Sequence, residues 1–144
     1  MVRKIRRKRK NQYLLRITRI ESIQVHDKPG HALSLVEMEG EPIGELDVGV
    51  AGEFVSRRSV TFLDRTKSTG PMMGYSMAYF RHGSVYTRFE GQRVSKEYEK
   101  STGTWKTYDG TGKLAGIKGE GTFKITLAER PNEFILDFEG EYEL

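Results

Sequence analysis

The chain has 144 residues, a length that suits one domain. It contains no cysteine, which excludes disulfides, thiolate metal sites and cysteine nucleophiles and leads us to expect a cytoplasmic location. No stretch approaches the roughly 18 consecutive apolar residues that a membrane-spanning helix needs, so no membrane span is expected.

The net charge of +4 is unevenly distributed along the chain. Residues 1–10 contain seven Lys and Arg residues and no acid, whereas the remaining 134 residues carry a net charge of −3. We therefore expect a basic N-terminal arm over residues 1–15, disordered or extended, followed by one folded domain over residues 16–144. The arm is interpreted as a nucleic-acid arm, an anchor to an anionic surface, a lid over a pocket or a solubilising terminus. Because the folded body is mildly acidic, nucleic acid is not expected as its partner.

From Ile17 onward, short runs of β-branched and aromatic residues alternate with turn signals. The breaks between runs are residues 28–30 (KPG), 39–42 (EGEP), 81–84 (RHGS), 109–110 (DG) and 129–132 (ERPN). Between these signals the sequence predicts strands at residues 17–27, 32–38, 53–63, 72–80, 85–89, 104–108, 122–127 and 134–142.

The last predicted strand has the clearest alternation. Phe134, Leu136, Phe138 and Tyr142 fall on one face, and acidic residues occupy the other with a break at Ile135. Such a period of two predicts an antiparallel sheet with one buried face, and no segment keeps a helical period. We expect an all-β fold, specifically a single antiparallel closed barrel of about eight strands, because closure removes exposed strand edges. A two-sheet sandwich is the alternative.

The densest glycine segment lies at residues 103–123. It does not match a phosphate-binding loop, because the Gly-Lys pair is followed by Leu114 and no helix is predicted. A strand, a tight turn, a compact loop and a second strand are expected there.

Residues 109–119 (DGTGKLAGIKG) resemble the G-G-[ST]-G-x-[FY]-x-G-x-x-G pattern of the allene oxide cyclase-like family. The last strand, rich in Phe and Tyr, and the hairpin at residues 75–91 are also similar to that family. The resemblance implies a calycin-like eight-stranded barrel related to dirigent-like proteins and to bacterial polyketide cyclases. It further implies catalysis by confinement of a reactive hydrophobic substrate, and a homo-oligomer.

Several residues depart from the family pattern. Plant allene oxide cyclases have a Glu and an Asn two residues apart on the first strand, where this chain has Ser22 and Gln24. Gly30 and His31 stand at the following Ser-Pro pair, and the family's pocket cysteine is missing. The resemblance therefore supports the fold and argues against that particular reaction.

Charged residues inside a barrel would indicate function, because an unpaired buried ion costs several kcal/mol. Arg58 shares its strand face with Phe62, and Glu37 shares its face with Leu35. If these faces point inward, both charges are internal and either pair or meet a ligand, whereas a β-bulge would move them outside. The ligand-binding candidates are Glu37, Arg58, Phe62, Tyr75, Met77, Tyr79 and Trp105.

The leading functional hypothesis is a barrel that binds a small hydrophobic molecule of unknown identity. The alternative is a cyclase or isomerase that confines a polyketide-like or oxylipin-like substrate in the barrel. A third hypothesis is an interaction module that uses the basic arm. No catalytic residue is assigned and no cofactor is expected. The three histidines, His26, His31 and His82, do not predict a metal site.

Overall fold

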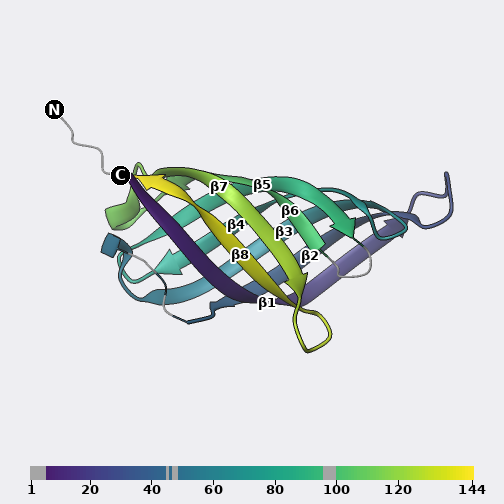
Figure 1. The fold of residues 1–144 in the computed structure, drawn as a ribbon, viewed down its shortest axis with the longest axis horizontal. Coiled ribbons are helices and arrows are strands. Elements are labelled where there is room, and N and C mark those ends of the chain that lie inside the picture. The colour runs from purple at the N-terminus through teal and green to yellow at the C-terminus, as the bar shows by residue number, and fades with distance from the viewer. Residues whose placement is uncertain (1–5, 45, 47–48, 96–99) are drawn as a thin grey trace.

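The computed structural model describes residues 6–44, 46, 49–95 and 100–144, with side chains described from Lys10 onward except for Ser95. Eight antiparallel strands form a closed barrel in which each strand pairs with the next and the last returns to the first (Figure 1). The strands are β1 (Arg6–Gln24), β2 (His31–Pro42), β3 (Phe54–Thr66), β4 (Gly70–Phe80), β5 (Gly83–Ser95), β6 (Lys100–Gly110), β7 (Lys118–Leu127) and β8 (Glu133–Glu143). The expected all-β closed barrel is confirmed, and the sandwich alternative is excluded.

The first strand extends into the segment that was expected to form a basic arm. Residues 1–5 lie outside the described residues, but residues 6–15 form the first part of β1 and pair with β8. The register places Lys10 opposite Glu139. Opposite charges at facing positions of an antiparallel pair stabilise it. An acidic residue of β8 therefore faces Lys10, the one residue of the basic run whose side chain is described.

The turns follow the expected breaks except at residues 39–42, which remain in β2 and pair with β1, and at Asp109-Gly110. The β4–β5 hairpin closes over Arg81 and His82, since Phe80 pairs with Gly83. Asp109 accepts a hydrogen bond from the Gly110 backbone through its side chain, yet both residues still pair with β5 inside β6. The predicted hairpin at this dipeptide is wrong, because the ladder continues and the connection to β7 is residues 111–117.

One end of the barrel is covered by two short 3-10 helices, η1 (Gly49–Ala51) and η2 (Gly112–Leu114), which lie at the same end in Figure 1. The His82 backbone joins them, because its N–H donates to Ala51 (2.9 Å) and its carbonyl accepts from Lys113 (2.7 Å). Ala51, Val85, Leu114 and Ile117 form a buried cluster beneath. We call this end the capped end.

Inward-facing glycines let aromatic rings lie close to the barrel wall. Gly121 of β7 pairs with Gly140 of β8, and a Cβ atom at either position would lie 2.6–2.7 Å from Cζ2 of Trp105. The same Cβ atoms would also lie 2.0–2.2 Å from a carbonyl oxygen of the neighbouring strand. The indole therefore rests on backbone that carries no side chain.

Among the helices in the described ranges, none is long and apolar enough to cross a membrane.

Candidate functional site

The barrel encloses a cavity of about 380 Å³. All eight strands contribute to its lining, because alternate residues of each strand point inward. The volume lies near the lower end of the range of roughly 300–1,000 Å³ that is typical of small-molecule pockets. Its aromatic lining comes mainly from the second half of the chain: Phe80, Phe89, Trp105, Phe123, Phe134, Phe138 and Tyr142.

Trp105 is the one sequence-predicted site residue that lines this cavity. Its side chain is 4% exposed, and its Nε1 donates a hydrogen bond to the Thr122 carbonyl (3.1 Å). The indole also makes an edge-to-face contact with Phe138, at 5.9 Å between ring centroids. These contacts fix the orientation of a large apolar surface that faces the cavity.

The other six predicted residues lie on the outer surface. Glu37 and Arg58 form an ion pair with each other, which matches the predicted pairing although it forms outside the barrel. The Arg58 hydrogen bond is the main cause that lowers the pKa of Glu37, and a hydrogen bond from Thr18 adds to it. On the same outer face, Phe62, Tyr75 and Tyr79 are 38%, 42% and 40% exposed, and Met77 lies between the two tyrosines.

A β-bulge in β3 explains why Arg58 and Phe62 face outward. The β3–β4 register shifts between Phe54 and Ser56, so Phe54 packs on the core although Phe62, at the same sequence parity, does not. From Arg57 to Arg65, every second residue of β3 lines the cavity instead. The inward orientation considered for Arg58 and Phe62 is therefore wrong, because the bulge reverses the alternation.

One sequence signal would have identified the inner face correctly. In β4, Ser76 and Ala78 alternate with Tyr75, Met77 and Tyr79, and the small residues line the cavity. A barrel that keeps a hollow interior needs small side chains on its inner wall. The assumption that the more apolar face is the buried one fails for such a strand.

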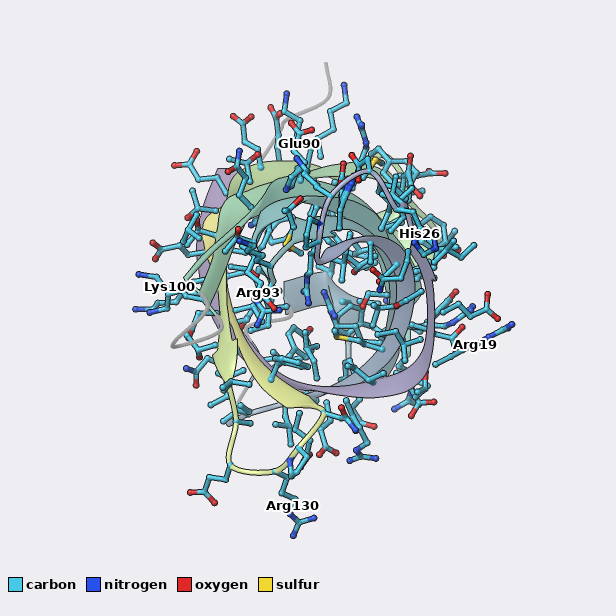
Figure 2. The ribbon with its side chains drawn as sticks, turned by 90° about the vertical axis from the view of Figure 1, so that its right-hand side faces the viewer. Arg19, His26, Glu90, Arg93, Lys100 and Arg130 are labelled. Carbon is cyan, nitrogen blue, oxygen red and sulfur yellow. The ribbon has the colours of Figure 1, made fainter. Side chains whose placement is uncertain are left out.

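Among the described side chains that line the cavity, three are cations and none is an acid. Arg57, Arg65 and Arg93 line it, whereas no Asp or Glu is among the described lining residues. Figure 2 looks along the barrel and shows Arg93 inside the ring of strands, while Arg19, His26 and Arg130 lie outside it. The charged side chains in the described lining are therefore all cations, whereas the outer positions of β8 carry acids.

Arg57 lies against the face of Tyr13. Its guanidinium carbon is 5.1 Å from the Tyr13 ring centroid, a cation–π geometry, and the Tyr13 ring stacks on Phe138 at 5.6 Å. Burial lowers the pKa of Arg57 and raises the pKa of Tyr13, the latter against the opposing effect of the Arg57 charge. Tyr13 therefore keeps its phenolic proton, and Arg57 keeps its charge because guanidinium is not deprotonated in proteins.

His31 has two carboxylate partners on the outer surface. Its Nδ1 lies 2.6 Å from Oδ1 of Asp27, and its Nε2 lies 2.7 Å from Oδ1 of Asp64. Within the described part of the chain, no group of three or more histidines and acids is arranged to hold a metal ion.

The chain is similar in structure to several solved proteins, although no family model and no curated protein matches its sequence. A pyocyanin demethylase has 14% identity and a TM-score of 0.53, over 92% of this chain and 98% of that protein. The pterocarpan synthase dirigent protein GePTS1 has 9% identity and a TM-score of 0.60, over 97% and 88% of the two chains.

AbnU, an exo-specific intermolecular Diels-Alderase, has 11% identity and a TM-score of 0.52, over 99% of this chain and all of that protein. At these identities the likeness shows a related barrel fold and nothing finer. The resemblance to the allene oxide cyclase-like family stays a prediction.

Proposed function

We propose that this barrel binds one small, largely apolar molecule in its central cavity. The observation that carries the proposal is the 380 Å³ chamber, which is lined by aromatic and aliphatic side chains from all eight strands. Transfer of apolar ligand surface from water into such a chamber is favourable by roughly 25 cal/mol per Å². The similar folds support it further, since a pyocyanin demethylase and a Diels-Alderase are named for chemistry on small organic molecules.

Within this proposal, Trp105 is the wall residue that contacts the ligand. Its ring is held by the hydrogen bond to Thr122 and by the contact with Phe138, so it presents the same surface to every occupant. The six predicted residues on the outer face have no place in the cavity. We keep the ligand class expected from the sequence, and we assign its binding to residues of the inner wall in place of the six outer residues.

A cyclase or isomerase is the second candidate. The observation that favours it is the presence of a cation, Arg57, and a phenolic donor, Tyr13, in an otherwise mostly apolar chamber. Donors fixed in a site that excludes water stabilise negative charge as it develops in a transition state. This activity would be indicated if a ligand incubated with the protein gave a product of the same mass that elutes at a different time in chromatography.

The proposal is tested with N-phenyl-1-naphthylamine, an uncharged fluorescent probe of apolar sites. We expect saturable binding, with energy transfer from Trp105, which is the single tryptophan of the chain. Ser76→Phe places a ring on the inner wall and should weaken binding by at least about tenfold, because the ring occupies the cavity.

Met77→Phe is the matched control, because it adds a ring at the next residue on the outer face. It should leave the affinity for the probe unchanged. Circular dichroism confirms that both variants fold. If the folded protein does not bind the probe, or if both variants affect binding equally, the cavity is not the binding site.

A further inference from the structure

Arg57 has a guanidinium donor that the folded chain leaves unused. Its Nη1 is buried and has no hydrogen-bond partner among the residues that the structure describes. No ion pair joins Arg57 to an acid among the described residues. The contact with Tyr13 is made by the ring face, which attracts the cation but accepts no conventional hydrogen bond.

A buried cation of this kind is costly to the folded protein. Removing a charge from water without a full set of partners costs several kcal/mol. The next residue, Arg58, shows the ordinary solution, because it lies outside and pairs with Glu37. The inward position of Arg57 therefore calls for a partner that the described chain does not supply.

The position of Arg57 suits the charged end of a ligand. It pairs in register with Gly40 of β2 and Ala78 of β4, and neither neighbour has a side chain that would cover it. β3 begins at Phe54, so Arg57 lies three residues into the strand. Arg65 and Arg93 also line the cavity, but each takes part in a further interaction of the folded protein.

We propose that the ligand is an apolar molecule that carries one anionic group, such as a carboxylate, and that Arg57 binds this group. The inference rests on the proposed function, since it names the class of molecule that the cavity takes. The planar guanidinium presents parallel N–H donors that match the two oxygens of a carboxylate. The aromatic wall around Trp105 and Phe138 holds the apolar body.

Two dyes that differ only in an anionic group test this inference. N-phenyl-1-naphthylamine is neutral, and 8-anilino-1-naphthalenesulfonate is the same molecule with a sulfonate. In Arg57→Met the dissociation constant of the sulfonate dye should rise by at least about tenfold. The neutral dye should bind Arg57→Met as it binds the wild type. Arg58→Met is the matched control on the outer face and should change neither dye.

The outcomes separate the two proposals. Failure of the neutral dye to bind the wild type overturns the proposed function. If the neutral dye binds but Arg57→Met and Arg58→Met affect the sulfonate dye equally, the assignment of Arg57 is overturned and the cavity remains a binding site.

A measurement on the wild type alone covers the case in which Arg57→Met does not fold. Decanoate and decan-1-ol have the same chain length, and each displaces the neutral dye if it enters the cavity. Decanoate should compete at concentrations at least about tenfold lower, because the cation favours the carboxylate. Equal or weaker competition by decanoate overturns the inference, since the alcohol partitions more readily into an apolar site.

Discussion

His31 links the β1–β2 turn to β3 through two carboxylates. Because each ring nitrogen faces a carboxylate oxygen, both nitrogens must donate, and the imidazole is positively charged in this arrangement. The hydrogen bonds to Asp27 and Asp64 raise the pKa of His31, and the bond to His31 lowers the pKa of Asp27. The link is therefore weakened when rising pH deprotonates His31 and when falling pH protonates Asp27.

The sign of each shift gives a pH window for this link. The contribution of His31 is fully present below its unfolded pKa of 6.5 and is lost as pH rises through its raised folded value. The contribution of Asp27 is present above its unfolded pKa of 3.8 and is lost as pH falls through its lowered folded value. The stability difference between the wild type and His31→Gln should therefore be largest between these two values.

Urea unfolding of both proteins from acid to mildly alkaline pH measures this difference. His26→Gln is the control, because His26 is an exposed histidine near the same turn. If the wild type and His31→Gln lose stability in parallel across neutral pH, the link does not contribute.

At the scale of elements, the sequence predicts where strands lie better than which way they face. Each of the eight predicted runs overlaps one of the eight strands, although residues 25–27 and 53 lie outside them, since β-branched and aromatic residues bounded by turn signals mark the strands. In β8 the inward positions are also correct, because Phe134, Leu136 and Phe138 alternate without interruption and line the cavity.

In β3 the inward face could not be predicted from the pattern. One bulge residue reverses the alternation, and Ser59 and Thr61 on the inner wall look like solvent-facing residues. The inner polar positions belong to the hollow that defines the candidate site. The site was therefore missed where the strand departs from the rule that the apolar face is buried.

The glycine pair beneath Trp105 gives a prediction for β8. Gly140→Ala would place its Cβ 2.2 Å from the Glu120 carbonyl oxygen and 2.6 Å from Trp105, so the backbone or the ring must move. We expect a loss of about 1–3 kcal/mol in the free energy of unfolding, as for other overpacked sites. Chemical denaturation measures it.

Gly40→Ala is the control for this substitution. Its nearest atoms belong to the side chains of Leu15 and Arg57, which can adjust. Equal losses for both variants would show that close packing under the indole is not the cause.

At the scale of the whole molecule, closure of the barrel means that copies of the chain can associate through outer side chains but not through a free strand edge. A closed sheet has no free edge strand to pair with another chain. One outer region is rich in aromatic rings: Tyr75 contacts Tyr108, Tyr79 contacts Tyr86, and Tyr86 contacts Tyr108. We call these four residues the outer tyrosine face. The homo-oligomer expected from the sequence stays a prediction, and this face is its candidate surface.

Sedimentation velocity tests that prediction. We expect the wild type to sediment as an oligomer and Tyr75→Ser/Tyr79→Ser to sediment as a smaller species with unchanged binding of the neutral dye. Leu127→Ser, which replaces an exposed apolar residue of β7, is the control and should leave the oligomer intact. A wild type that sediments as a monomer at micromolar concentration contradicts the expectation.

The glycines under the indole have a consequence for which molecules the chamber accepts. Trp105 forms part of the lining, but the depth to which its ring recedes is set by Gly121 and Gly140, which do not line the cavity themselves. A single methyl group behind the ring would push it toward the centre and reduce the available space. Under the proposed function, the size of the ligand would therefore depend on two glycines behind the indole that do not line the cavity.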